Sequence, residues 1–332
     1  MNTQYRECVN LTRFRLSFVR SHFFSLPPQA IARLCSFLDS DNDDKGKLFQ
    51  DKEYVEYYTT CYDMCTQRTP YNWSDQLYSR HGVVIQDYLR ESVLTRLEEQ
   101  GKEGDIFLLK ELQHKWENHK LMNKWMVKFF MYLDRYHVKH HTLDTLSEVG
   151  LKKFKAIIFD EIKTNATAIV LSMINQERNE VLVDRGLLKQ VVGLYETMGL
   201  GELQTYTSDF EEQFLRSSRE EYSRRSLAWI ETDSTPDYLL KAEKALTAES
   251  ARVKSYLNNS TEAKLLRVVE DELLLKCQKN LLEKSGSGCI ALLSNQKYED
   301  LARMFDLFNR LENGLQPMAD LFKKFVEGQG FR

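Results

Sequence analysis

Long stretches of the chain alternate apolar and charged positions with the period of an α-helix. The windows 106–140 and 237–284 contain neither proline nor glycine and are filled with Leu, Lys, Glu, Gln and Arg. Uninterrupted segments of strong helix formers predict long helices. No window shows the Val, Ile and Thr alternation of strands bounded by hairpin turns. We therefore predict an all-α fold.

Short polar segments separate the predicted helices. They cover residues 68–74, 98–105, 140–149, 176–184, 232–237, 258–263 and 284–288. Loops this short favour antiparallel packing of neighbouring helices. The segment TDSTPD at 232–237 also predicts a helix start, because a Ser or Thr hydroxyl can cap free backbone N–H groups and Pro236 sits where no N–H is needed.

The helix predicted over EYVEYYTTCYDMCTQ (53–67) carries more apolar surface than one core needs. One flank suits an inner core and consists of Tyr57, Cys61, Met64 and Cys65. The opposite flank is left over and consists of Val55, Tyr58 and Tyr62. Tyrosines on such an edge can bury a ring against a partner while the hydroxyl stays hydrogen-bonded.

The segment LMNKWMVKFFMYLDRYHVKH (121–140) predicts a second helix of the same kind. Along one border of its apolar arc runs an apolar, aromatic and basic stripe of Leu121, Lys128, Tyr132, Arg135 and Lys139. Arg and Tyr are favoured at interfaces because each combines a large packing surface with a polar end. One such stripe alone is more often a solvated helix edge. Two of them close in sequence predict a docking surface.

The N-terminal part of the chain differs in composition from the rest. The first 38 residues carry five Arg against one acid, Glu7. An Arg-rich, acid-poor segment resembles an organellar transit segment, although Glu7 argues against this. The simpler interpretation is a poorly packed leader with one short helix after Pro27 and Pro28, followed by a polar linker over 39–47.

Composition and charge narrow the class of protein. The 332 residues are long enough for two or three packed units, and 42% hydrophobic with 29% charged residues is an ordinary globular balance. A formal net charge of −3 gives no basic excess, so we expect no nucleic-acid partner. No run of eighteen apolar residues exists, so we expect no membrane segment. Six scattered cysteines do not form a secreted disulfide framework, and we expect the cytoplasm and nucleus.

A metal or catalytic site finds little support. Cys61 and Cys65 share a helix face and could supply half of a zinc site, but a closed site needs two more ligands. The nearest histidine cluster is His137, His140 and His141, and nothing in the sequence places it beside the cysteines. His114 and His119 belong to a polar helix and are expected to be solvated. Buried small hydrophobes are the simpler interpretation of the two cysteines.

Catalytic signatures are missing from the sequence. GLGEL at 199–203 lacks the glycine spacing of a dinucleotide loop, and neither GxxxxGK nor HExxH occurs. Cys289 follows SGSG, but no histidine is placed to activate it. We therefore expect no catalytic residues, no metal, no cofactor and no enzyme activity.

Six sequence blocks together resemble a known family. They are EYVEYYTTCYDMCTQ, KWENHKLMNKWMVKFFMYLDRYHV, INQERNEVLVDRGLLKQVVGLYETMGL, YTSDFEEQFLRSSREEYSRRS, DYLLKAEKALTAESARVKSYLNNSTEAKL and EDLARMFDLFNRLENGL. In this order they resemble the N-terminal half of a cullin, most closely the plant version of the first cullin, which serves F-box proteins. The resemblance implies an elongated stalk of five-helix cullin repeats, each an antiparallel bundle. Repeat 1 would cover 48–150, repeat 2 151–275 and the start of repeat 3 276–332, after a divergent leader and linker at 1–47.

The resemblance also implies a partner and a binding site. In this family the second and fifth helices of the first repeat dock a BTB/POZ-fold adaptor, which holds an F-box substrate receptor. The family's docking positions fall on Val55, Tyr58, Tyr62, Tyr132 and Arg135. The helical wheels add Lys128, Tyr136 and Lys139, and Tyr54, Thr59 and Leu121 complete the candidate site.

The expected role follows from what the resemblance covers. It ends before the family's globular C-terminal half, which binds the RING protein and carries the lysine that accepts the Nedd-type modifier. We therefore expect no RING partner and no neddylation site in these residues. The expected function is a non-catalytic scaffold of an SCF-type ubiquitin ligase. The alternative is a truncated decoy or degenerate cullin-like protein that binds adaptors but cannot recruit the RING protein.

Overall fold

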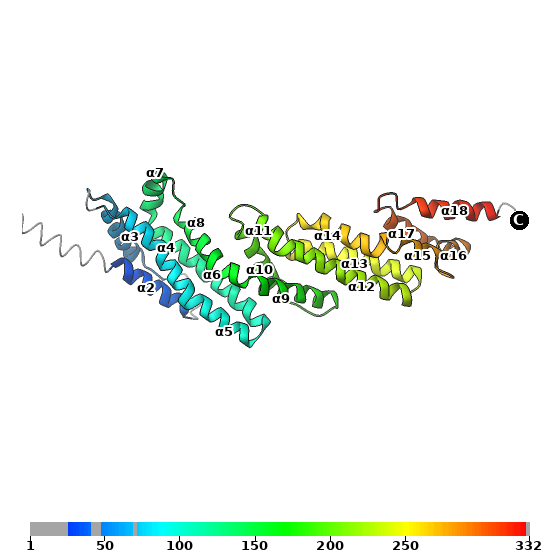
Figure 1. Ribbon diagram of the computed structural model, residues 1–332, viewed down its shortest axis with the longest axis horizontal. Helices are drawn as coiled ribbons and strands as arrows, with labels where there is room; N and C mark the ends of the chain where they lie inside the picture. The colour runs from blue at the N-terminus through cyan, green and yellow to red at the C-terminus, as the bar shows by residue number, and fades with distance from the viewer. Residues whose placement is uncertain (1–25, 41–47, 69–71, 330–332) are drawn as a thin grey trace, which may run out of the picture. The chain divides into compact units, whose positions relative to one another are not determined.

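The computed structural model describes residues 26–40, 48–68 and 72–329, and these form helices joined by short loops (Figure 1). No strand occurs among the described residues, in agreement with the all-α prediction. The chain divides into two compact units, with the boundary between Ala166 and Thr167. The repeat boundaries inferred from the sequence stay predictions.

Unit 1 is built from helices of 3 to 25 residues. They are α2 (Leu26–Asp39), α3 (Asp51–Thr66), α4 (Ser74–Tyr88), η1 (Leu89–Leu94), α5 (Thr95–Glu103), α6 (Asp105–Phe129), η2 (Leu133–Val138), α7 (Lys139–His141), α8 (Leu146–Phe154), η3 (Lys155–Phe159) and the start of α9 (Asp160–Arg178). The η elements are π-helical. The loop predicted over 98–105 is reduced to Gly104, whose φ of 149° allows the chain to reverse between α5 and α6.

Helix α2 is a packed part of unit 1. Its Leu34 and Leu38 side chains are buried, and Asn118 Nδ2 of α6 donates a hydrogen bond of 2.9 Å to the Leu38 carbonyl. The helix expected after Pro27 and Pro28 therefore forms, and it packs against α6. Residues 1–25 and 41–47 lie outside the described residues, so the interpretation of the leader and linker concerns residues that the structure does not describe.

Unit 2 continues α9 and adds α10 (Arg185–Thr197), α11 (Gln204–Tyr206), η4 (Thr207–Glu211), α12 (Glu212–Thr232), α13 (Thr235–Tyr256), α14 (Thr261–Glu270), η5 (Asp271–Leu275), α15 (Gln278–Glu283), α16 (Cys289–Ser294), α17 (Tyr298–Phe308) and α18 (Gln316–Gln329). Helices α12, α13 and α14 lie side by side (Figure 1). The predicted start of α13 is confirmed: Ser234 Oγ accepts a hydrogen bond of 3.3 Å from the Asp237 N–H.

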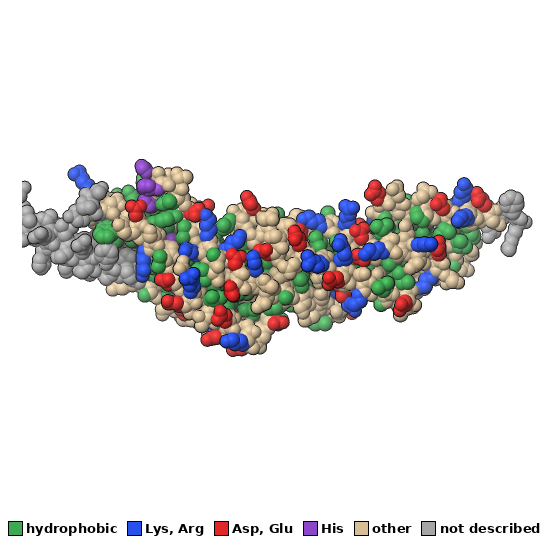
Figure 2. All heavy atoms as spheres, viewed as in Figure 1, with side chains coloured by type: hydrophobic (Ala, Val, Ile, Leu, Met, Phe, Trp, Pro, Cys, Tyr) green, Lys and Arg blue, Asp and Glu red, His purple; other side chains and the backbone are tan. Residues whose placement is uncertain are grey.

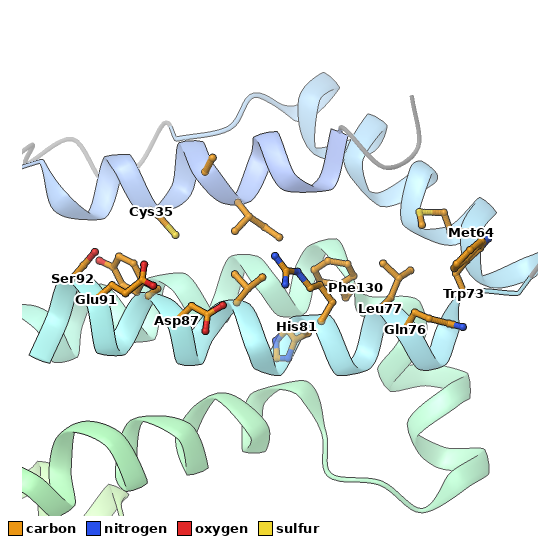
Figure 3. A pocket seen from close by; sticks show the side chains of 15 residues that line it. Cys35, Met64, Trp73, Gln76, Leu77, His81, Asp87, Glu91, Ser92 and Phe130 are labelled. Carbon is orange, nitrogen blue, oxygen red and sulfur yellow. The ribbon is translucent and has the colours of Figure 1, made fainter. Parts of the chain in front are cut away.

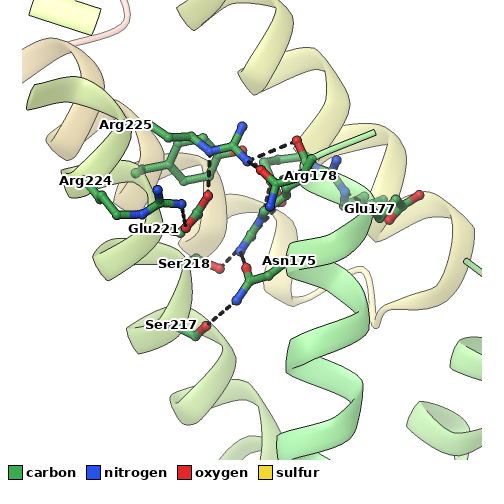
Figure 4. Close-up of polar contacts among 12 residues, drawn as sticks. Asn175, Glu177, Arg178, Ser217, Ser218, Glu221, Arg224 and Arg225 are labelled. Carbon is green, nitrogen blue, oxygen red and sulfur yellow. Dashed lines mark hydrogen bonds and ion pairs between the residues drawn. The ribbon is translucent and has the colours of Figure 1, made fainter. Parts of the chain in front are cut away.

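A buried ionic network joins α9, α12 and α13 in unit 2. The Arg178 and Glu249 side chains are 1% and 0% exposed. Arg178 Nε donates to Glu249 Oε1 at 2.9 Å, and Arg252 Nη1 donates to the same oxygen at 2.6 Å. Arg178 also reaches Ser218 of α12 and Asn175 of its own helix (Figure 4). Each buried charge thus has a counter-charge and further hydrogen bonds, which buried ions require.

The histidines of α6 do not behave as expected. His119 is 1% exposed, and its Nε2 lies 3.1 Å from the Gly150 carbonyl oxygen. Burial lowers the pKa of His119 to about 4, so the ring is neutral at neutral pH. The prediction of solvation is wrong because α8 packs across this face of α6, at a glycine that allows close approach. His114 is half-buried, and its Nε2 lies 3.1 Å from Asn118 Nδ2.

Within residues 26–40, 48–68 and 72–329, none of the helices combines the length and the apolar character needed to span a membrane.

Candidate protein-docking surface

The inner flank of α3 forms part of the core of unit 1. Cys61, Met64 and Cys65 are at most 3% exposed. Tyr57 is half-buried, and its ring packs edge-on against Phe49 and Phe129, with ring centroids 5.7 and 5.5 Å away. The predicted packing role of this flank is confirmed. The wheel missed Thr60, which is buried and whose hydroxyl donates to the Glu56 carbonyl of the preceding turn.

The outer flank of α3 faces solvent. Val55 is 55% and Tyr62 is 41% exposed, Thr59 is exposed, and Tyr54 and Tyr58 are half-exposed. The helix start is fixed by the Gln50 N–H, which donates to Glu53 Oε2 at 2.8 Å. The flank is therefore presented on a regular helix with a defined beginning.

The second segment is not the single helix predicted over 121–140. Helix α6 ends at Phe129, Phe130 leaves the helical region with φ −103° and ψ 20°, and the chain continues through η2 and α7. Phe130 and Leu133, on either side of this break, are both buried. A 3.6-residue wheel assumes one uninterrupted period and cannot show such a shift.

A row of tyrosine rings connects the two segments. We call Tyr54, Tyr58, Tyr62, Tyr132 and Tyr136 the tyrosine row. Successive ring centroids along it are 6.3, 6.3, 5.1 and 4.7 Å apart. The contact between Tyr62 and Tyr132 crosses from α3 to the segment after α6. Burial raises the pKa of the Tyr132 phenol, so its hydroxyl remains a hydrogen-bond donor at neutral pH.

Basic side chains flank the tyrosine row. Arg135 and Lys139 are exposed and have no ion pair or hydrogen bond with any residue that the structure describes. Lys128 Nζ lies 4.6 Å from the centroid of the Trp125 ring, a cation–π distance. Leu121 is half-buried on α6. The surface thus combines aromatic area with cations free to pair with a partner.

Histidines stand beside this basic flank. His140 and His141 are exposed, and histidine side chains are visible at the surface by α7 (Figures 1 and 2). His137 is buried, with Nε2 3.5 Å from Asp75 Oδ1, and burial lowers its pKa. His137 is therefore mainly neutral and serves packing.

Sequence reasoning missed a contribution from α2. The Arg33 guanidinium lies 5.2 Å over the Phe49 ring and pairs with Glu53 at 2.6 Å. Phe49 in turn lies 4.9 Å from Trp125. The sequence interpretation placed α2 outside the first repeat, so no signal pointed to Arg33.

The exposed groups of this surface suit the binding of a partner protein. Burial raises the pKa values of Cys61 and Cys65, which keeps both as thiols. Cys289 is fully buried at the start of α16, and burial raises its pKa too. Within the described ranges, no group of three His, Cys, Asp or Glu side chains is placed to hold a metal ion. Exposed Tyr and Arg in one patch are typical of a protein interface.

Comparison with known proteins identifies the family. The sequence model of the Cullin alpha solenoid domain matches residues 43–332. The chain belongs to the cullin family. Its α-solenoid class agrees with the helices described above, and the six resembling sequence blocks all lie within the match.

Plant members of the cullin family are similar over most of the chain. Putative cullin-like protein 1 of Arabidopsis thaliana is 40% identical over 282 residues, covering 85% of this chain and 39% of that protein. Cullin-1 of Oryza sativa subsp. japonica is 43% identical over 282 residues, covering 85% and 38%. Putative cullin-like protein 2 of Arabidopsis thaliana is 38% identical over 304 residues, covering 91% and 79%. The chain thus spans about two-fifths of the length of the first two relatives.

Proposed function

We propose that the chain is a non-catalytic scaffold subunit of a cullin-RING ubiquitin ligase of the SCF type. In this role it binds a BTB/POZ-fold adaptor, and through it an F-box protein, in ubiquitin-dependent protein catabolism. Membership of the cullin family supports the scaffold role. The more specific part of the proposal is that the adaptor binds at the surface formed by α3 and the segment after α6.

The observation that carries the proposal is the tyrosine row. Its rings come from two segments far apart in the sequence and form one continuous aromatic strip on unit 1. Two exposed cations without partners among the described residues, Arg135 and Lys139, lie beside it. Such a strip suits an apolar partner surface with an acidic rim, because ring burial supplies affinity and charge pairing fixes the register.

Calorimetric titration of the chain with an adaptor–F-box complex is the direct test. Replacing Tyr58 and Arg135 together by alanine should weaken binding by about 3 kcal/mol, or roughly 150-fold in Kd, if both are central contacts. A Tyr62→Ala change should also weaken binding, since Tyr62 joins the two halves of the row.

Two control variants make the test specific. Cys61→Ala lies on the inner flank of the same helix and should leave the Kd unchanged. Tyr298→Ala with Arg216→Ala removes an exposed tyrosine and an exposed arginine from unit 2, and should also have no effect. Absence of binding by the unaltered chain, or equal affinity for the Tyr58 and Arg135 variant and its unit 2 control, would refute the proposal.

A second candidate role is competition with other cullins for adaptors. The observation behind it is the similarity to Putative cullin-like protein 2, 79% of which is covered by the match. Adding the chain to a reconstituted ubiquitination reaction distinguishes the roles, because a competitor slows turnover of an F-box substrate in proportion to its concentration. For either role we propose the cytoplasm and nucleus as the location, which imaging of a tagged chain can check.

A further inference from the structure

Unit 1 contains an elongated apolar groove between α2 and α4, separate from the tyrosine row (Figure 3). Its volume is about 690 Å³. Its lining follows α4 and η1 from Trp73 to Ser92, a distance of roughly 28 Å at a rise of about 1.5 Å per residue. Leu77 and Val84 of α4 and Ile31 of α2 supply apolar lining. A groove of this length and character suits the apolar side of a helix.

One wall of the groove carries negative charge. Asp87 and Glu91 lie one turn apart, on the opposite side of the groove from Cys35 of α2 (Figure 3). Neither carboxylate has an ion pair or hydrogen bond with a residue that the structure describes. Arg80 lies farther along the same wall. A helix bound here should therefore carry a cation beside its apolar side, at the Asp87 end.

Helix α18 of unit 2 has an apolar strip that stays exposed. The side chains of Phe322 and Val326, one turn apart, are 53% and 51% exposed, and Ala319 in the preceding turn is exposed as well. Met318 and Phe325, on the neighbouring side of the helix, are half-buried, and α18 packs against α16. One side of α18 thus belongs to its own unit, and the exposed strip is free to contact a partner.

Lys323 stands at the edge of this exposed strip. At about 100° per residue it lies about 60° around the helix from Val326 and about 40° from Ala319. Its ammonium group has no ion pair or hydrogen bond with a described residue. A lysine in this position can lay its stem along a groove and bring its charge to a carboxylate at the rim. Lys324, by contrast, lies on the far side of α18 from Phe322 and Val326.

We propose that the exposed strip of α18 from one copy of the chain binds in the groove between α2 and α4 of a second copy. Lys323 then lies near Asp87 and Glu91. The 14 residues of α18 span roughly 21 Å, so the helix fits within the length of the groove. Both surfaces are apolar, both are exposed in the described chain, and their charges are opposite at the Asp87 end. This contact is independent of adaptor binding.

The two surfaces in the contact are different, so it joins copies head to tail. A copy that donates α18 still has an open groove, and oligomers larger than a dimer can form. A contact made by one helix is smaller than a standard protein interface, so assembly should be reversible and should need micromolar or higher concentrations. Sedimentation velocity of the full chain over a dilution series measures this assembly. A mass that stays at one copy throughout, as it would if α18 bound the groove of its own chain, would overturn the proposal.

Two single substitutions block opposite sides of the contact. Phe322→Asp places a charge in the exposed strip, and Ala32→Arg fills the groove from an exposed position of α2. Each should weaken self-association at least tenfold. The matched controls are Phe107→Asp, at another phenylalanine that is 53% exposed, and Ala228→Arg, at an exposed alanine of α12. Neither control should change self-association, and a control as damaging as its partner variant contradicts the assigned surfaces.

Mixing the two blocked chains tests the head-to-tail arrangement. The Phe322→Asp chain keeps an open groove, and the Ala32→Arg chain keeps an intact α18. Each alone should be monomeric, and an equimolar mixture should form a dimer and nothing larger. A mixture that stays monomeric overturns the pairing of α18 with the groove. Self-association of either variant at full strength assigns the assembly to another surface and overturns it equally.

A charge exchange tests the position of Lys323 in the groove. Lys323→Glu should weaken self-association about tenfold, because its carboxylate would face those of Asp87 and Glu91. Adding Asp87→Lys and Glu91→Lys to the same chain should restore it. Lys324→Glu is the control, since this side chain points away from the groove, and it should have no effect. A loss that the exchange does not recover, or an equal loss with Lys324→Glu, overturns the assigned pairing.

Discussion

Replacing Glu249 by glutamine should destabilise unit 2 strongly. The carboxylate is fully buried and accepts hydrogen bonds from Arg178, Arg252 and the Tyr222 hydroxyl. Glutamine keeps the shape but leaves two buried guanidinium groups facing each other without their shared counter-charge. Removing one partner of a buried ion pair costs about 3–5 kcal/mol.

The structure places the expected loss at the lower end of that range. Arg252 Nε keeps its bond of 3.1 Å to Glu177 Oε2, and Arg178 Nη2 keeps its bond of 2.7 Å to Ser218 Oγ. Both cations therefore retain part of their stabilisation, and we expect a loss of about 3 kcal/mol. Because two compact units need not unfold together, one global unfolding midpoint is not an adequate measurement.

Hydrogen exchange followed by mass spectrometry resolves unit 2. A loss of about 3 kcal/mol should raise the exchange rate of protected amides in α12 and α13 by roughly 150-fold. Glu243→Gln is the control on the same helix, because Glu243 is half-exposed and pairs with Arg303 at the surface, where ion pairs contribute little. Equal exchange in the two variants would refute the assignment of stability to the buried network.

The same carboxylate should give unit 2 an acid-sensitive stability. Burial by itself would raise the pKa of Glu249, but the charges and hydrogen bonds of Arg178 and Arg252 lower it overall. The folded pKa then lies below the unfolded value of about 4.3, so the stabilisation is present above that pH and is lost as the pH falls further. The Glu249→Gln variant should lose less unfolding free energy than the unaltered chain across this acidic range.

Two further substitutions test the packing of unit 1. Gly150→Ala should lower its stability by about 1–3 kcal/mol, measured as faster hydrogen exchange of protected amides in α6 and α8, because a Cβ atom at Gly150 would collide with the Asn123 amide. Gly101→Ala in the same unit, which meets only ordinary contact with Leu108, should be neutral or stabilising, and equal effects would contradict this. His81→Leu should stabilise unit 1 by about 1 kcal/mol, since both ring nitrogens of the buried His81 lack hydrogen-bond partners within the described residues. Burial lowers the pKa of His81 to about 4. The unaltered chain should therefore lose stability as the pH falls from about 6.5 towards 4. A His81→Leu variant with the same pH dependence would contradict this.

Local chemistry made parts of the structure predictable from sequence. The start of α13 depends on the Ser234 hydroxyl and Pro236, which act within one turn. The two flanks of α3 follow the 3.6-residue period because the helix is regular from Asp51 to Thr66. The choice of the outer edge of α3 for docking stays a prediction from the family resemblance, because a helical wheel alone cannot separate docking from solvation.

The features that sequence reasoning missed depend on contacts between distant residues. His119 is buried because α8 crosses α6 at Gly150, and Leu38 is held by Asn118, which is 80 residues away. The meeting of Tyr62 and Tyr132 likewise depends on how α3 packs against the end of α6. The break at Phe130 leaves no proline or glycine as a marker in the sequence.

That break has a consequence for how related chains can be compared. Tyr132 precedes the π-helical stretch Leu133–Val138 and Tyr136 lies within it, so each residue added or removed between them turns Tyr136 by roughly a quarter of a turn. At the present length of this stretch Tyr136 contacts Tyr132, whose ring in turn contacts Tyr62 of α3. A single-residue gap between 132 and 138 would therefore alter this surface more than several substitutions within it.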